Sequence, residues 1–457
     1  MESNEKSKTI KYVLISCGVV LLVGCLCLGL VLISGIGVSN IWPIELPVES
    51  TQAPISTPVS KLPEDLVGTI AEIESQVVQI RGLENVQEVQ HTMISAEELE
   101  EIVVEDFFSE YSEEDARQDV LVLSSLGLLP RDFDLKGFYE ALYSEQIAGF
   151  YDEETKEIYV VQGQDFGASE RLTYAHEFTH VLQDQVYGLD EGLGMNQESC
   201  EVDSEKCAAV QALVEGDASM TEILWFQAHA SIEDYRDLME MLDHLETPVL
   251  DSAPPYMSAD MYFSYEKGLA FVQHLYDQGE YKSVDQAFAN PPVSTEQILH
   301  PEKYPLDVPL SVSLPDLSSQ LDDTWTLFDQ NVMGEWYVFL ILNKAHDESY
   351  RVSEETAQIA AEGWGADAYA IYLNEETDET IFIMDSLWDT TEDANEFVDA
   401  FYQYASQRWT SLSVTLSDAR LWQGSDTKIA FWHQGDRTLW VIAPDNDLLE
   451  IILSELQ

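Results

Sequence analysis

The sequence is poor in basic residues. Of its 457 residues, 21 are Lys or Arg and 85 are Asp or Glu, which gives a formal net charge of −64. Such an excess of negative charge repels nucleic acids and anionic lipid headgroups, so we expect no nucleic-acid partner. The charge is compatible with basic or neutral substrates, although an acidic solvated surface without a specific partner is the simpler interpretation.

Cysteine is also scarce. Cys17, Cys25 and Cys27 lie in the apolar N-terminal stretch, whereas Cys200 and Cys207 lie in a polar segment. This distribution excludes a disulfide scaffold and leaves one possible bridge in the remainder of the chain. The spacing of Cys200 and Cys207 fits neither common zinc pattern, which favours a disulfide that braces a loop over a thiolate metal site.

Charged residues are absent from one long stretch near the N-terminus. No charge occurs from Tyr12 to Ile44, and Val13–Val38 is almost wholly apolar. Because a helix of about 20 apolar residues can cross a bilayer core, we predict a transmembrane anchor at residues 12–38.

The basic residues before this stretch predict its orientation. Lys6, Lys8 and Lys11 directly precede it. By the positive-inside rule, residues 1–11 are expected in the cytoplasm and the chain after about residue 40 outside it.

An alternative form of anchoring is lipidation. Leu22–Cys25 resembles a bacterial lipoprotein cleavage box, with Cys25 as the lipidated residue. The chain stays apolar through Val38, however, whereas a mature lipoprotein usually turns polar, so an uncleaved anchor is favoured. Both alternatives predict a membrane-tethered, extracytoplasmic protein.

The rest of the chain divides into three parts by composition. Residues 39–61 combine prolines with Ser and Thr and predict an extended linker. Residues 62–315 show mainly helical periodicity, and residues 324–457 mix strand and helix patterns, which predicts an α+β fold with a smaller C-terminal α+β domain of unknown role. The expected helices include 66–77, 94–111, 116–126, 333–345 and 392–405, and the expected strands of the last part are 369–373, 380–384, 413–416, 428–432 and 438–442.

A β-hairpin is predicted in the middle of the chain, before its central helix. Gly149–Tyr151 and Ile158–Val161 are β-prone and flank the polar turn Asp152–Glu157. The helix that follows is expected to start near Ser169, a candidate N-cap, and to end near Gly188.

This central helix carries the motif His-Glu-x-x-His. His176 and His180 are four residues apart, so both imidazoles lie on one helix face and can bind one ion. Glu177 lies beside that face, where its carboxylate can take a proton from water. The motif therefore predicts a catalytic zinc site with Glu177 as its base.

A catalytic zinc ion is held by three protein ligands, so a third ligand is needed. Glu215 is the best candidate, because small residues surround it and would let a second helix approach the first closely. Glu222 is the main competitor, and a solvated helix carboxylate is the alternative interpretation for either residue.

The motif helix His176–Asp184, with a Glu on a later helix, resembles the gluzincin (thermolysin-like) zinc metallopeptidases. A closer similarity, over about residues 62–305, is to bacterial membrane-anchored proteins with a Gly-Phe-Tyr-Asp hairpin, a His-Glu-Phe-Thr-His helix and a Glu-Gly-Asp-Ala segment. The resemblance implies zinc at His176, His180 and Glu215, with Glu177 as general base. It also implies that substrate lies along the hairpin strand near Ile158–Val161.

The sequence departs from the thermolysin pattern after Glu215. Ser219 stands where those enzymes have an Asp, and Asp217 is expected to face another way. Asp184 is therefore the better candidate to orient a ligating imidazole, as carboxylates near metal sites commonly do, or else it is simply solvated.

Peptide hydrolysis also needs a group that stabilises the developing oxyanion. The candidates are Tyr262, Tyr265 and His300, of which Tyr265 and His300 are the predicted catalytic residues. A position in the hydrophobic core is the alternative interpretation for the tyrosines.

Together these features predict an extracytoplasmic, membrane-anchored zinc metallopeptidase that acts on peptides or proteins. Two alternatives remain open at this stage. One is an inactive metal-containing surface module that binds a partner, and the other is a zinc hydrolase that acts on a non-peptide bond.

Overall fold

The structure is a computed structural model that describes residues 64–94, 111–146, 149–152, 156–161 and 166–457. The predicted anchor at 12–38, the linker at 39–61 and most of the expected helix 94–111 lie outside these residues. In the part of the chain that is described, no helix is both long and apolar enough to span a bilayer.

The N-terminal elements agree in part with the sequence analysis. Helix α3 (Glu64–Arg81) places Ile70, Ile73 and Val77 in a buried core, as its periodicity predicts. Strand β1 (Gln90–Ile94) reaches the position where the helix 94–111 is expected to start, so that start is wrong. Helix α5 (Glu113–Ser125) begins with a capping box at Ser112.

A small three-stranded sheet contains the predicted hairpin. Strands β2 (Gly149–Asp152) and β3 (Glu157–Val161) pair antiparallel, and β1 pairs parallel to β3 on its other side. The order β1-β3-β2 makes β3 the central strand, so both of its edges are already paired along this sheet. The expectation that substrate lies along β3 is therefore wrong, because β2 is the neighbouring edge strand.

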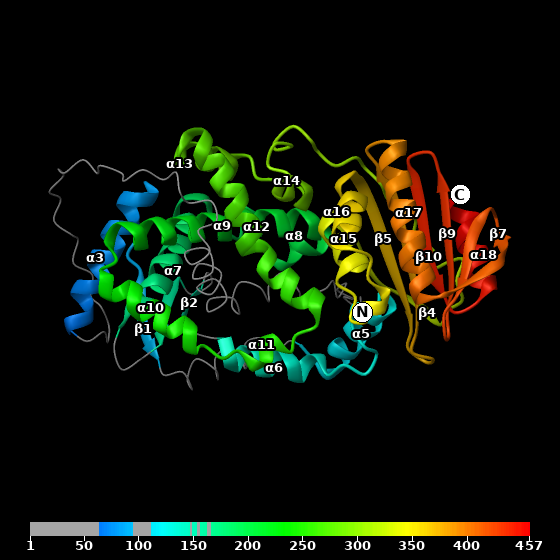
Figure 1. Ribbon diagram of the computed structural model, residues 1–457, viewed down its shortest axis with the longest axis horizontal. Helices are drawn as coiled ribbons and strands as arrows, with labels where there is room; N and C mark the ends of the chain where they lie inside the picture. The colour runs from blue at the N-terminus through cyan, green and yellow to red at the C-terminus, as the bar shows by residue number, and fades with distance from the viewer. Residues whose placement is uncertain (1–63, 95–110, 147–148, 153–155, 162–165) are drawn as a thin grey trace, which may run out of the picture.

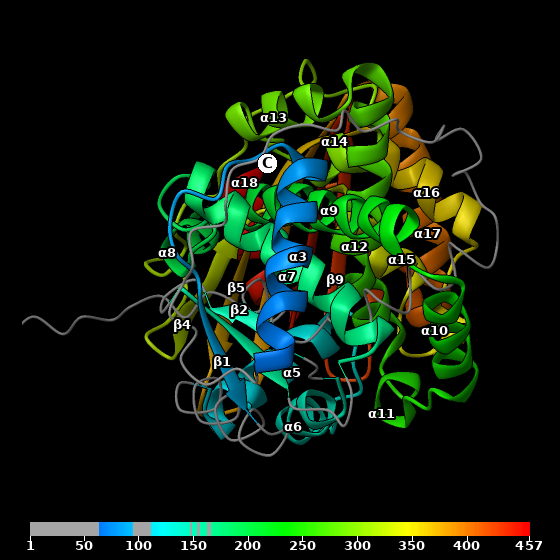
Figure 2. The ribbon, with the colours of Figure 1, turned by 90° about the vertical axis from the view of Figure 1, so that its left-hand side faces the viewer.

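Long helices form the centre of the N-terminal half. Helix α9 (Ser204–His229) packs against both α7 (Ala168–Tyr187) and α12 (Pro255–Gly279). Helix α3 packs on α7 and α9 (Figure 2). The shorter helices around them are α6 (Leu135–Gln146), α8 (Gln197–Val202), α10 (Ile232–His244), α11 (Pro248–Asp251), α13 (Tyr281–Ala289) and α14 (Thr295–Leu299).

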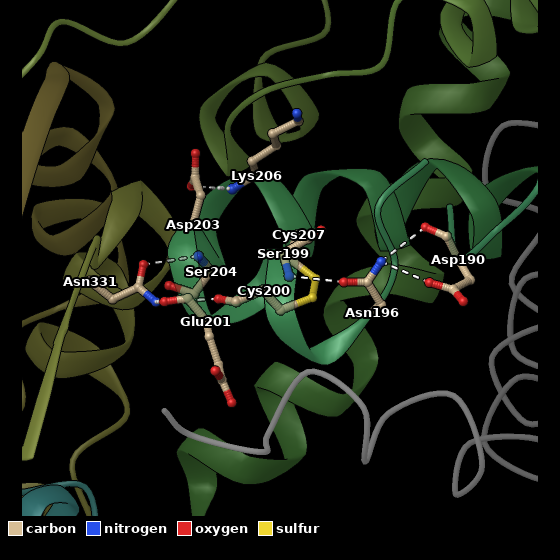
Figure 3. Close-up of a disulfide and its surroundings, with 10 residues drawn as sticks. All are labelled: Asp190, Asn196, Ser199, Cys200, Glu201, Asp203, Ser204, Lys206, Cys207 and Asn331. Carbon is tan, nitrogen blue, oxygen red and sulfur yellow. Dashed lines mark hydrogen bonds between the residues drawn. A yellow bond between two sulfur atoms is a disulfide. The ribbon is translucent and has the colours of Figure 1, made fainter. Parts of the chain in front are cut away.

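A disulfide joins α8 to the first turn of α9. Cys200 and Cys207 are bridged, as the sequence favours, with their Cα atoms 5.3 Å apart (Figure 3). The side chain of Asn331 donates to the carbonyls of Cys200 and Glu201 and accepts from the amide of Ser204. This joint therefore connects the helical half to the C-terminal sheet.

The C-terminal part is a seven-stranded antiparallel sheet in the order β4-β5-β6-β10-β9-β8-β7. Helix α17 (Thr391–Arg408) covers one face and α18 (Asn446–Leu456) covers the other (Figure 1). The expected α+β class is confirmed. The remaining elements are β4 (Trp325–Asn331), α15 (Gly334–Asn343), a short 3-10 helix (Glu348–Tyr350), α16 (Glu354–Glu362), β5 (Trp364–Asn374), β6 (Glu379–Trp388), β7 (Thr410–Leu416), β8 (Ala419–Gln423), β9 (Lys428–Gln434) and β10 (Arg437–Ala443).

One hydrophobic core continues from the helical half into this sheet. It includes Leu213 of α9, Tyr256 of α12, Trp336 of α15 and Tyr369 of β5, all buried. Because burial of apolar surface is the main stabilising contribution to a fold, the two parts support each other through a shared core.

Candidate metal centre

Helix α7 positions the motif. It begins at Ala168, close to the expected start near Ser169, but its N-cap is Gly167, so the predicted cap at Ser169 is wrong by two residues. The amide of Gly167 donates to the Glu170 side chain at 3.0 Å. The helical spacing places the rings of His176 and His180 4.8 Å apart, centroid to centroid. Both imidazoles point to the same side of α7, toward α9.

Helix α9 supplies the third side chain. Glu215 Oε2 lies 3.2 Å from His176 Nε2 and 3.5 Å from His180 Nε2. One ligand atom from each residue can be chosen so that all three lie within 4.8 Å of one another. The structure thus brings together the three side chains that the sequence predicts as ligands.

The second nitrogen of each imidazole has its own partner. His176 Nδ1 lies 3.1 Å from Glu222 Oε2, and His180 Nδ1 lies 2.8 Å from Gln183 Oε1. Glu222 therefore contacts the nitrogen that faces away from Glu215 and is placed to orient His176. Contacts of this kind fix the orientation of a metal-binding histidine.

Asp184 does not take the orienting role predicted for it. One carboxylate oxygen accepts from Tyr151 Oη at 2.7 Å and from Lys156 Nζ at 2.6 Å, and the other accepts from the amide of Leu189. These contacts attach the β2–β3 hairpin to α7. Asp184 follows His180 by four residues, but its side chain serves the hairpin instead of an imidazole.

Glu177 is held by the edge strand of the small sheet. The amide of Tyr151, in β2, donates to Glu177 Oε2 at 2.7 Å. Its other oxygen, Oε1, is buried without a hydrogen-bond partner among the described residues. Burial raises the pKa of the Glu177 carboxyl, although the nearby His180 and His176 oppose that effect. One oxygen is thus anchored while the other is free to exchange a proton.

The acidic and basic side chains of this cluster shift one another's pKa values. Burial opposes ionisation of Glu215, but the imidazoles of His180 and His176 lower its pKa to about 2. Burial likewise disfavours a protonated His176, yet Glu215 and Glu222 raise its pKa well above the ordinary range. A carboxylate that stabilises positive charge at both imidazoles would also stabilise a divalent cation at the same position.

The two other predicted catalytic residues lie in different surroundings. Tyr265 of α12 is buried beside the cluster, with its ring centroid 6.2 Å from that of His176. His300 follows α14, and its Nε2 lies 2.9 Å from Glu335 of α15. The described contacts of His300 include none with the cluster, so we do not assign it a role there.

Close backbone contact between α9 and α12 supports the position of Glu215. A Cβ atom at Gly216 would lie 2.2 Å from the carbonyl oxygen of Gly268, and a Cβ at Gly268 would lie 2.1 Å from that of Ala212. The small residues around Glu215 are predicted to let α9 approach the motif helix, and α9 does pack on α7. Gly216, one of these small residues, also admits α12 on another side of α9.

Replacing Gly268 by Ala should therefore destabilise the fold. Because the clash is with backbone, α12 must shift, and we expect the free energy of unfolding to decrease by about 1–3 kcal/mol. Chemical denaturation measures this change. Gly68→Ala is the matched control, since Gly68 lies in helix α3 and a Cβ atom added there would have nothing within 4 Å, so we expect a small gain in stability. Equal stability of the Gly268 variant and the wild type would contradict the close packing.

Sequence reasoning missed the polar groups behind the cluster. Gln183 follows His180 by three residues, a helical spacing that could have identified it. Tyr151 contacts Glu177 through its backbone amide, which almost any residue type could supply, so the sequence does not indicate this contact. A cleft of about 310 Å³, lined by residues such as Arg131, Arg408 and Trp409, contains none of the predicted site residues.

Comparisons with known proteins concern only the C-terminal part. Residues 325–453 match a family described as "Domain of unknown function (DUF8575)", which spans the seven-stranded sheet and its helices. Searches of curated proteins and of solved structures give no match. The family match covers none of the residues of the metal cluster.

Proposed function

We propose that this chain is a zinc-dependent metallopeptidase of the gluzincin type. The observation that carries the proposal is the convergence of His176, His180 and Glu215 beside the buried carboxylate of Glu177. Three protein ligands leave a position open, as in catalytic zinc sites, whereas structural zinc sites are usually closed by four.

The donor set fits zinc better than the common alternatives. Two imidazole nitrogens and one carboxylate oxygen are typical zinc ligands, whereas Mg²⁺ and Ca²⁺ prefer sites made of oxygen atoms. All three side chains are at least mostly buried, with exposed side-chain fractions of 4% for His176, 12% for His180 and 2% for Glu215. A site with little water strengthens the attraction between the ligands and a cation.

Glu177 is the proposed general base. A bound zinc ion supplies Lewis acidity and lowers the pKa of water at the site to about 7. Glu177 Oε1 receives the proton of the attacking water and passes it to the leaving amine, while Oε2 stays fixed by the amide of Tyr151. Tyr265 is the proposed donor to the oxyanion, because it lies beside His176.

The surrounding elements support a peptide substrate. Strand β2 is the edge of the small sheet and contacts the base, so an extended peptide added along β2 would pass next to Glu177. The proposed anchor at residues 12–38 would hold the enzyme at the membrane with this site outside the cytoplasm. The disulfide between Cys200 and Cys207 suits such an oxidising compartment.

Hydrolysis of a mixed library of quenched peptides by the full chain in detergent tests the proposal. We expect cleavage with zinc, loss of cleavage when a chelator removes the metal, and recovery when zinc is added back. Absence of cleavage by protein that binds one zinc ion would contradict peptidase activity. It would favour either the inactive binding module or hydrolysis of a non-peptide bond.

A further inference from the structure

A buried chain of polar side chains leads away from His180. Gln183, fully buried, has its Oε1 2.8 Å from His180 Nδ1. Its Nε2 donates to the carbonyl of Val214 at 3.0 Å and to Asp217 Oδ2 at 2.8 Å. The proposed peptidase mechanism does not use Gln183 or its partners Val214 and Asp217 directly. Their hydrogen bonds nevertheless hold the Gln183 side chain in a fixed position next to His180.

Arg81 of α3 completes this chain. Its Nε donates to Asp217 Oδ2 at 2.9 Å, and its Nη1 lies 2.7 Å from Asp285 Oδ1. The side chains of Arg81 and Asp217 have no solvent exposure, and the guanidinium lies 4.6 Å from the ring centre of Tyr281. The desolvation cost of a buried ion pair can exceed the attraction between its charges, so such a pair is weak evidence for stability alone. A single side chain, Gln183, separates this pair from His180.

The direction of the hydrogen bonds follows from two acceptors. Asp217 accepts from Arg81, whose side chain only donates, and the Val214 carbonyl can only accept. Gln183 therefore presents its NH₂ group to Asp217 and Val214, which turns its carbonyl oxygen toward His180. An oxygen acceptor at 2.8 Å requires a proton on His180 Nδ1. The nitrogen left for a metal ion is then Nε2, which lies 3.5 Å from Glu215 Oε2.

We propose that Arg81, Asp217 and Gln183 form a relay that fixes the tautomer of His180, so that Nε2 is always the nitrogen offered to the metal. The proposal rests on the proposed zinc site and adds positioning residues to it. The relay connects α3, α7 and α9, so it also couples the position of the N-terminal helix to the geometry of the ligand.

The test compares two Asp→Asn substitutions on the same arginine. Arg81 Nε and Gln183 Nε2 both donate to Asp217 Oδ2. In Asp217→Asn a single uncharged amide oxygen must accept both bonds, and the NH₂ group lies against the Arg81 guanidinium. Gln183 is then held less firmly, and we expect zinc affinity to fall about 10- to 100-fold. Asp285→Asn is the matched control. Asp285 contacts the same guanidinium but has 45% side-chain exposure and lies outside the relay, so its variant should keep wild-type affinity.

A second variant and a spectroscopic measurement separate positioning from a general loss of structure. Gln183→Leu removes the acceptor at His180 Nδ1 and leaves the Arg81–Asp217 ion pair in place, so its zinc affinity should fall at least as far as that of Asp217→Asn. Nitrogen-15 histidine spectra of the zinc-loaded proteins should show a protonated Nδ1 on His180 in the wild type, and faster exchange of that proton with water in both variants.

The outcomes distinguish the relay from the zinc site itself. Wild-type affinity and an unchanged His180 signal in Asp217→Asn would overturn the relay and leave the zinc site in place. Equal losses in Asp217→Asn and Asp285→Asn, or wild-type affinity in Gln183→Leu, would also overturn it. Failure of the wild type to bind zinc would instead overturn the proposed zinc site.

Discussion

Replacing Glu177 by Gln should abolish peptide hydrolysis and leave zinc bound. Glutamine has the same shape, and its side-chain oxygen can still accept from the amide of Tyr151, which lies 2.7 Å from Glu177 Oε2 in the wild type. It cannot take up a proton, however, and general base catalysis contributes about 10²–10⁴-fold to the rate. We therefore expect kcat to fall by at least this factor, measured with a quenched peptide, while metal analysis shows unchanged zinc content.

Glu170→Gln is the control for this experiment. It is the same substitution on the same helix, and glutamine can replace glutamate in a capping box, so α7 should remain intact. Both its activity and its zinc content should match the wild type. Retained hydrolysis in Glu177→Gln would refute Glu177 as the base. Loss of zinc in that variant would refute the expected metal retention, and its lower activity would then say nothing about proton transfer.

The sequence predicted well those features of the site that depend on local spacing. The face shared by His176 and His180 follows from helix periodicity alone, and the hairpin before α7 follows from β-prone residues around a polar turn. Glu215 required more, because its approach depends on how two helices pack. It was identified from the resemblance and from the small residues beside it, and the structure places it at the cluster.

Features that depend on distant pairing were not predictable from the sequence. The insertion of β1 beside β3 makes β2 the edge strand, and nothing near Ile158 indicates a parallel partner from residues 90–94. The same holds for Arg81, which reaches Asp217 from another helix. Asp184 is predicted to orient an imidazole or else to be solvated, but its partners Tyr151 and Lys156 come from the hairpin, which no local pattern around Asp184 indicates.

The C-terminal sheet shows the same division between local and distant information. Its strongly apolar strands, such as β5 and β10, match predicted segments. Strands β4 and β8 are not predicted from the sequence, because neither contains a long apolar run. Pairing with a neighbouring strand, and not intrinsic preference, forms such strands.

The second large effect is expected from Glu215→Ala, which should nearly abolish zinc binding. Glu215 is the only carboxylate placed between the two Nε2 atoms among the described residues, at 3.2 and 3.5 Å. Glu222 instead contacts His176 Nδ1 at 3.1 Å, so Glu222→Ala should weaken binding by only about 10- to 100-fold, as for a group that orients a ligand. Isothermal titration of both metal-free variants with zinc measures the difference.

Two further variants make this comparison specific to the role of each carboxylate. Glu222→Gln keeps an oxygen that accepts from His176 Nδ1, so its zinc affinity should lie closer to the wild type than that of Glu222→Ala. Glu215→Gln loses the charge that balances the cation, so it should bind zinc poorly although it preserves size. A larger loss of affinity in Glu222→Ala than in Glu215→Ala would reassign the third ligand. In that case His176 would have to turn its Nδ1 toward the metal, because Glu222 contacts that nitrogen.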